Sequence, residues 1–212
     1  MAKFDFIRLK TDFLPRCGPV QIALLLLSAL SFIASFSAVV QWGFYHAELT
    51  AAGQWWRPFT AWFTQRDGLH WLINQWGVLV MLLLLPARLT RLQSLGFVVV
   101  WLYSSLCLLH SSYQAYVGLS GVLYGWLVLS AYYSPYYSRF VKAVFVAILL
   151  VKVLLENQFI FGLSWQSQTV TQLLQGPVAY RSHWWGISSG LVYLFLLALL
   201  HWFTGRSRRA PL

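Results

Sequence analysis

The segment Gly118-Leu-Ser-Gly-Val-Leu-Tyr-Gly125 opens an apolar run that extends over about residues 119–134. Gly121 and Gly125 are four residues apart, so on a helix they would form one face of small residues that lets a second helix approach closely in lipid. Ser120 is a polar group at the start of the run, and a polar group within a membrane is costly enough to suggest a function. The segment therefore predicts a closely packed membrane helix with a candidate functional serine at its start.

The composition of the whole chain is typical of a polytopic membrane protein. Apolar residues make up 59% of the 212 residues and charged residues only 9%, whereas a soluble domain carries roughly 25% charged residues. The net charge of +10 could indicate nucleic acid as a partner. The basic residues are scattered between apolar runs, however, and this pattern is better explained by membrane topology. We expect a lipid bilayer, and no nucleic acid, around this chain.

The two cysteines, Cys17 and Cys107, share no motif, which favours packing roles over a disulfide or a metal site. The sequence contains no HExxH zinc motif and no Gly-rich phosphate loop. We therefore predict no metal and no cofactor. The first apolar run begins near Val20 and is about 20 residues long, which suits a spanning helix better than a cleavable signal peptide.

The apolar runs predict an all-α membrane protein with six transmembrane helices. We expect one membrane domain over residues 20–203, preceded by an N-terminal segment, 1–19, and followed by a basic tail, 204–212. Several runs approach the roughly 20 residues that a bilayer requires, and the shorter ones would begin below the surface. The runs cover approximately residues 20–40, 70–86, 92–109, 119–134, 140–156 and 183–203, with long connecting segments at 41–69 and 157–182.

The basic residues predict the orientation of these spans. Placing both termini in the cytoplasm puts most of the 15 basic residues on the inner side, as the positive-inside rule requires. The segment 41–69 then becomes a long first outer loop. The residues on the predicted inner side are Lys3, Arg8, Lys10, Arg16, Arg88, Arg91, Arg139, Lys142, Arg206, Arg208 and Arg209.

Three polar motifs begin the second, fourth and sixth predicted spans. They are His70-Trp-Leu-Ile-Asn74, the Ser120 segment, and His183-Trp-Trp-Gly186-Ile-Ser-Ser-Gly190. These three spans run in the same direction, so the motifs should meet at one depth near the outer face. Gly186 and Gly190 form a second small-residue face that could pack against the first one.

Close packing of these two glycine faces would bring Ser120 within reach of His183, as a nucleophile and its base require. One alternative is that the glycines only pack helices and that Ser120 bonds its own backbone. Another is a small transporter, but the paired half-spans and midplane charges of that class are missing from the pattern. The spans also lack the aspartate pair of an aspartyl intramembrane protease, so a serine–histidine dyad is the chemistry that remains.

At these residues the sequence resembles the rhomboid proteases over about 40–203. The matching motifs are Trp56-Arg57 in the first loop, HxxxN at His70, GxSG ending at Gly121, and HxxGxxxG at His183. The resemblance implies a six-helix rhomboid bundle and an intramembrane serine protease that requires no cofactor. Its substrates would be transmembrane proteins.

The resemblance also implies a role for each residue of the motifs. Ser120 would be the nucleophile, and His183 the general base and then the general acid. His70, Asn74 and the Ser120 backbone N–H would form the oxyanion hole, with Gly118 keeping the backbone close to the oxyanion.

Tyr124 matches the ring that supports the catalytic histidine in rhomboids. We expect no acid to orient the imidazole, so that stacking on this ring would hold it instead. One departure from the family is Gln65, at a position five residues before the HxxxN motif where many rhomboids have a structural histidine. This departure concerns loop packing rather than catalysis.

Three segments resemble the rhombosortase subgroup: the Ser120 motif through Tyr124, Lys152-Val-Leu-Leu-Glu156, and Gly176-Pro-Val-Ala179. This resemblance implies a protein of the bacterial inner membrane with its active site facing the periplasm. It would process exported proteins that carry a C-terminal tag of Gly-Gly, an apolar span and a basic cluster. The acyl-enzyme could go to water or, in a transpeptidase-like reaction, to an amine. The alternative is a catalytically inactive rhomboid-like protein that binds membrane clients.

Lys152 and Glu156 are four residues apart near the outer end of the fifth predicted span, so they share a helix face and can pair. One interpretation is that both side chains reach outward to the lipid headgroups. The other rests on the resemblance to rhomboids, in which substrates enter between the second and fifth spans, so that the pair would border this entrance.

Overall fold

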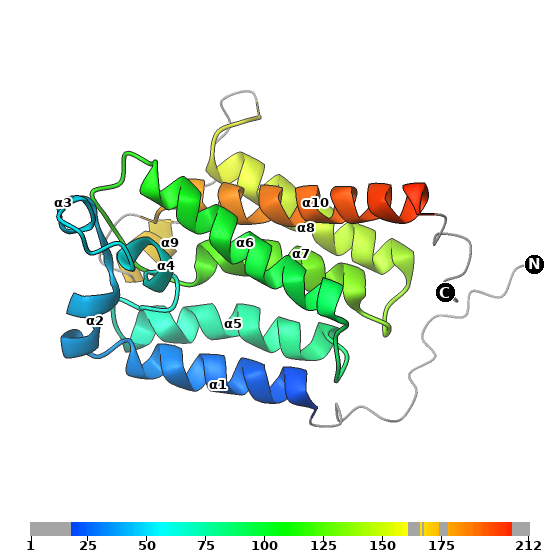
Figure 1. The fold of residues 1–212 in the computed structure, drawn as a ribbon, viewed down its shortest axis with the longest axis horizontal. Helices are drawn as coiled ribbons and strands as arrows, with labels where there is room; N and C mark the ends of the chain where they lie inside the picture. The colour runs from blue at the N-terminus through cyan, green and yellow to red at the C-terminus, as the bar shows by residue number, and fades with distance from the viewer. Residues whose placement is uncertain (1–17, 161–165, 167, 174–177, 205–212) are drawn as a thin grey trace, which may run out of the picture.

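A computed structural model describes residues 18–160, 166, 168–173 and 178–204, and its architecture is mostly helical (Figure 1). The predicted N-terminal segment up to residue 17 and the basic tail after residue 204 lie outside this range. In chain order the elements are α1 (Pro19–Ile33), α2 (Ser37–Gly43), β1 (Tyr45–His46), α3 (Ala47–Ala51), α4 (Arg57–Thr60), α5 (Gly68–Leu84), α6 (Arg91–Leu109), β2 (Ala115–Tyr116), α7 (Ser120–Tyr133), α8 (Arg139–Glu156), α9 (Gln168–Leu173) and α10 (Tyr180–Phe203).

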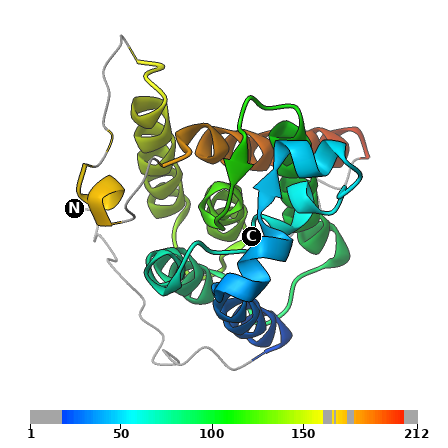
Figure 2. The same ribbon diagram turned by 90° about the vertical axis from the view of Figure 1, so that its left-hand side faces the viewer.

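Helix α7 is the central helix of the bundle. It contacts α5, α6, α8 and α10, and Figure 2 shows it enclosed by its neighbours. Its sequence is apolar all round, and such a helix is buried rather than exposed on one side. The buried residues of α7 are Gly121, Val122, Leu123, Gly125, Trp126, Leu127, Val128, Leu129, Ser130, Ala131 and Tyr133.

The outer helices turn large apolar side chains outward. Examples are Leu30 on α1, Phe140 and Ile148 on α8, and Phe195 on α10, each more than 60% exposed. A soluble protein rarely exposes apolar surface on this scale, whereas lipid is a suitable solvent for it. The predicted class, an all-α membrane protein, is therefore confirmed.

Each predicted apolar run overlaps one of the longer helices, α1, α5, α6, α7, α8 or α10, most of which begin one to three residues before the run. Within the part of the chain that the structure describes, α6 and α10 are long and apolar enough to cross a membrane. Helices α1 and α2 would add a third span if this bent pair is counted as one span. Helix α5 is apolar but, at 17 residues, shorter.

The first apolar run is not the single straight helix expected over 20–40. It is divided into α1 and α2, whose axes are bent by 105° at residues 34–36. At the break, the Ala34 carbonyl accepts a hydrogen bond from the Gln65 backbone N–H at 3.3 Å, and the Ser35 hydroxyl donates to the Phe32 carbonyl at 2.6 Å. These bonds satisfy backbone groups that a continuous helix would have paired internally, so the chain can turn toward the first loop.

The long segment 41–69 is ordered around Arg57, which is buried although it is charged. Its guanidinium donates to the Phe44 carbonyl at 2.7 Å, the Gln41 carbonyl at 3.1 Å and the Gln54 side chain at 2.7 Å. Burial lowers the pKa of Arg57 from its ordinary value, and the three acceptors compensate for the lost hydration.

Strand β1 in this loop pairs with β2, which lies shortly before Ser120. The pairing is antiparallel, with Tyr45 opposite Tyr116 and His46 opposite Ala115. This two-stranded sheet is an addition to the expected all-α architecture. It joins the first loop to the start of α7.

Helices α7 and α10 meet through glycines. A Cβ on Gly125 would lie 2.9 Å from the Gly186 carbonyl carbon, and a Cβ on Gly190 would lie 2.9 Å from the Gly125 carbonyl oxygen. A Cβ on Gly186 would overlap the Gly121 carbonyl oxygen. The obstructing atoms are backbone, which cannot rotate away as a side chain can. The predicted small-residue faces therefore do pack against each other.

We predict that Gly186→Ala destabilises the bundle, because the added methyl group forces α7 and α10 apart. Overpacking typically costs about 1–3 kcal/mol, more than the about 1 kcal/mol that alanine gains over glycine in a helix. Thermal unfolding in detergent should show a lower melting temperature. Gly68→Ala is the matched control, since a Cβ there meets nothing within 4 Å. Equal melting temperatures for the two variants would contradict the packing described.

Candidate active site

Ser120 is the first residue of α7, and the turn before it is built on Gly118. Gly118 has a φ of +127°, a conformation that favours glycine. A Cβ at Gly118 would also lie 2.6 Å from His70 Cε1. The Gly118 N–H donates to the Ala61 carbonyl at 3.0 Å. Glycine at this position thus lets the backbone lie directly against His70.

The carbonyl of Gly118 is held by Tyr116. The Tyr116 hydroxyl lies 2.9 Å from that carbonyl oxygen and 3.2 Å from Ser182 Oγ. Burial raises the pKa of Tyr116 above its ordinary value, so the hydroxyl stays protonated and can donate. Sequence reasoning missed Tyr116 and Ser182. The only available signal was their position, two residues before Gly118 and one residue before His183.

Ser120 and His183 come together although they are 63 residues apart in the chain. Ser120 Oγ lies 3.1 Å from His183 Nε2, which is the spacing of a hydrogen bond. His183 is buried in the first turns of α10. The close glycine contact of α7 with α10 lies one turn below this pair and makes the approach possible.

The other ring nitrogen of His183 faces an acid. Glu156 is the last residue of α8, and its Oε2 lies 2.8 Å from His183 Nδ1. The expectation that no acid orients the imidazole is therefore wrong. The Tyr124 ring also lies against the imidazole, with a centroid distance of 4.5 Å and an interplanar angle of 33°. His183 thus has one support at its edge and another at its face.

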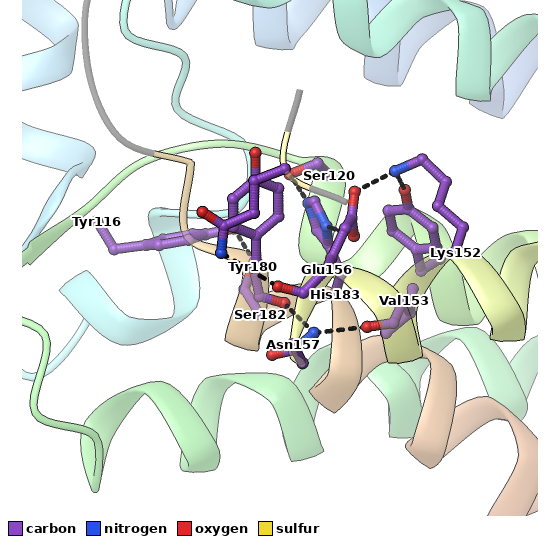
Figure 3. Close-up of polar contacts among 11 residues, drawn as sticks. Tyr116, Ser120, Lys152, Val153, Glu156, Asn157, Tyr180, Ser182 and His183 are labelled. Atoms are coloured by element: carbon purple, nitrogen blue, oxygen red, sulfur yellow. Dashed lines mark hydrogen bonds and ion pairs between the residues drawn. The ribbon is translucent and has the colours of Figure 1, made fainter. Parts of the chain in front are cut away.

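Lys152 lies one turn before Glu156 and forms an ion pair with Glu156 Oε1. Its Nζ also donates to the Tyr124 hydroxyl at 2.6 Å. Figure 3 shows Lys152 beside Glu156. The Lys152 side chain is 49% exposed, whereas that of Glu156 is only 5% exposed. The interpretation that both side chains reach outward to the headgroups is therefore wrong for Glu156, which points into the protein because His183 lies there.

His70 and Asn74 are both buried on one face of α5. The helix starts at this site because the Asp67 carboxylate caps it, accepting from the His70 backbone N–H at 2.8 Å. The Asn74 amide donates to Gln65 Oε1 at 2.8 Å and retains a second N–H. Gln65 is fully buried, so glutamine at this position packs the loop and holds Asn74.

The arrangement has the parts needed for nucleophilic acyl transfer. A hydroxyl lies against one nitrogen of an imidazole, and a carboxylate lies against the other. This order of nucleophile, base and orienting group recurs on unrelated folds that attack carbonyl carbons.

Comparison with known proteins agrees with this chemistry. The family model described as the Rhomboid domain matches residues 52–200, which include Ser120, Glu156 and His183. No curated protein and no solved structure matches the chain. Because the match covers well over half of the sequence, this chain belongs to the rhomboid family, whose members are serine proteases that act on transmembrane substrates within the lipid bilayer.

Proposed function

We propose that this protein is an intramembrane serine endopeptidase in which Ser120 is the nucleophile and His183 the general base. The observation that carries the proposal is the distance of 3.1 Å between Ser120 Oγ and His183 Nε2, at the end of a lipid-adapted helix bundle. An inactive client-binding protein would have no need for this contact.

The reaction follows from the positions of these two groups. Ser120 Oγ attacks the carbonyl carbon of the scissile peptide while its proton passes to His183 Nε2. The C–N bond then breaks as His183 returns the proton to the leaving amine. The resulting acyl-enzyme is released by water or, in the alternative outcome, by a second amine.

The negative charge that develops on the carbonyl oxygen is stabilised at the start of α7. The first N–H groups of a helix have no partner within it and carry partial positive charge. The Ser120 N–H is one of these donors. His70 and the second N–H of Asn74 complete the oxyanion hole, next to the Gly118 backbone that lies against His70.

We further propose six membrane spans, α1, α5, α6, α7, α8 and α10, with both termini in the cytoplasm of a bacterium. Helices α5, α7 and α10 all begin at one end of the bundle, at the left in Figure 1. Arg91 and Arg139 begin α6 and α8 at the other end, which is the cytoplasmic end by the positive-inside rule. The active site then faces the periplasm from within the inner membrane.

For the substrate, we propose exported proteins with a C-terminal Gly-Gly, apolar span and basic cluster, processed as by a rhombosortase. The support is the resemblance of the Ser120 and Lys152-to-Glu156 segments to that subgroup. Of the third resembling segment, 176–179, the first two residues lie outside the described residues. The test compares the C-termini of exported proteins by mass spectrometry in cells with and without this chain. Unprocessed tags in both cell types would contradict this substrate class.

We predict that Ser120→Ala and His183→Ala each abolish cleavage of a transmembrane substrate, while both proteins still insert and fold. The two groups act as one unit, so the double variant should be no worse than either single one. A fluorophosphonate probe should label the wild-type serine and leave Ser120→Ala unlabelled. Ser188→Ala is the control, because Ser188 Oγ donates only to carbonyls of its own helix. Clear residual turnover in Ser120→Ala would refute the assignment.

We predict that Asn74→Ala lowers kcat by roughly 10²-fold to 10³-fold, as the loss of one oxyanion donor does. KM should change little, because the lost bond forms mainly in the transition state. Gln75→Ala is the matched control on the same helix, because the Gln75 side-chain carbonyl accepts a hydrogen bond from the Ser28 hydroxyl on α1. Wild-type kcat in Asn74→Ala would remove this residue from the oxyanion hole.

A further inference from the structure

Glu156 is a carboxylate in an unfavourable place. It is 5% exposed and is the last residue of α8, where both burial and the negative end of the helix dipole oppose its charge. Its two oxygens are both engaged, Oε2 by His183 and Oε1 by Lys152. A buried ion pair usually adds little to the stability of a protein. A role other than stability is therefore needed to explain a carboxylate at position 156.

The contact with His183 determines which tautomer the imidazole adopts. Glu156 Oε2 is an acceptor 2.8 Å from Nδ1, so Nδ1 carries the hydrogen and donates it. Nε2 then presents its lone pair to Ser120 Oγ, 3.1 Å away. The other tautomer would set two acceptors against each other and leave Nε2 unable to take a proton.

Lys152 links the two supports of His183. It pairs with the Glu156 carboxylate at the edge of the imidazole and donates to Tyr124, whose ring lies on the face of the imidazole. Asn157 holds the end of α8 to the start of α10, because its amide donates to the Val153 carbonyl at 2.9 Å and the Tyr180 carbonyl at 3.1 Å. In Figure 3, dashed lines join Lys152 to Glu156 and Asn157 to Val153.

From these contacts we propose that Glu156 is a positioning residue that completes a Ser120–His183–Glu156 triad, and that Lys152 keeps Glu156 ionised and in place. The inference rests on the proposed protease function and deepens it. When Nε2 takes the proton of Ser120, the carboxylate stabilises the imidazolium and keeps accepting from Nδ1. Glu156 itself takes up no proton, and Lys152 does not contact the reacting atoms.

The first test is Glu156→Gln, which preserves shape and removes the charge. We expect kcat to fall by roughly 10²-fold to 10⁴-fold, as in serine proteases that lose the acid of their triad. KM and the melting temperature should stay near the wild-type values, because His183 rather than the substrate or the fold is affected. Glu48→Gln is the matched control on an exposed acid of α3. Undiminished kcat in Glu156→Gln would overturn the proposal.

The second test is a double-mutant cycle with Lys152→Met. Alone, this change should lower kcat less than Glu156→Gln does, and equally for substrates of unrelated sequence. Combined with Glu156→Gln it should add no further loss, because Lys152 acts through Glu156. Lys142→Met, near the other end of α8, is the matched control. Multiplied losses would show that Lys152 does not act through Glu156, and a loss confined to one substrate would show that Lys152 contacts the substrate; either result would overturn the role given to Lys152 here.

Two further measurements separate this inference from the proposed function. If the wild type is labelled by a fluorophosphonate and Glu156→Gln is labelled at the same rate, only the triad is refuted; if the wild type is not labelled at all, the protease function fails. In histidine-labelled Ser120→Ala protein, ¹⁵N NMR should show neutral His183 with its hydrogen on Nδ1. This measurement needs no activity and no change at Glu156. A hydrogen on Nε2 would overturn the triad.

Discussion

The contact between the backbones of α7 and α10 is the constraint on which the candidate site depends. Serine has a short side chain, so its hydroxyl reaches an imidazole on a neighbouring helix only if the two helix axes lie unusually close. Gly121, Gly125, Gly186 and Gly190 provide that closeness, because a Cβ at any of them would meet atoms at 2.9 Å or less. In lipid, where apolar side chains gain little by associating with one another, such close packing is a main source of helix association. The same glycines thus hold the bundle together and set the distance between Ser120 and His183.

A second constraint is that polar groups inside the bundle need partners. Tyr116 lies between Gly118 and Ser182, and Asn74 donates to Gln65. Lys152, Glu156, His183 and Ser120 form a continuous chain of polar contacts. Within that chain only Lys152 has a side chain about half exposed. The Glu156 carboxylate is therefore stabilised by Lys152 from the exposed end of this chain of contacts, while Glu156 and His183 remain buried, where each electrostatic contact is stronger.

The loops contribute as much to the site as the long helices. Arg57 gathers the first loop around its guanidinium, and β1 pairs with β2 just before Ser120. The Ala61 carbonyl then accepts from the Gly118 N–H. Through these bonds, a segment that joins two predicted spans positions the turn that carries Ser120, the proposed nucleophile. Rigid placement of this kind is needed because small displacements of catalytic groups cost large factors in rate.

Several features could be predicted from the amino-acid sequence because they depend on local pattern. The low share of charged residues and the long apolar runs indicate a membrane protein, and the motifs at His70, Ser120 and His183 indicate the rhomboid family, which the comparison confirms. The spacing of the glycines placed them on helix faces that could pack, and the structure has these faces in contact.

Tertiary structure alone decided the rest. The break at residues 34–36 lies in a run that is apolar throughout, and it occurs where Gln65 from a distant loop bonds to Ala34. The position of Glu156 against His183 depends on how α8 is rotated against α10, and a spacing of four between Lys152 and Glu156 only shows that they share a face. The sequence by itself therefore determined the membrane class, the family and the pairing of serine with histidine. The acid that faces the imidazole was decided by the packing of the bundle, because helix periodicity specifies which residues share a face but not which neighbour that face will meet.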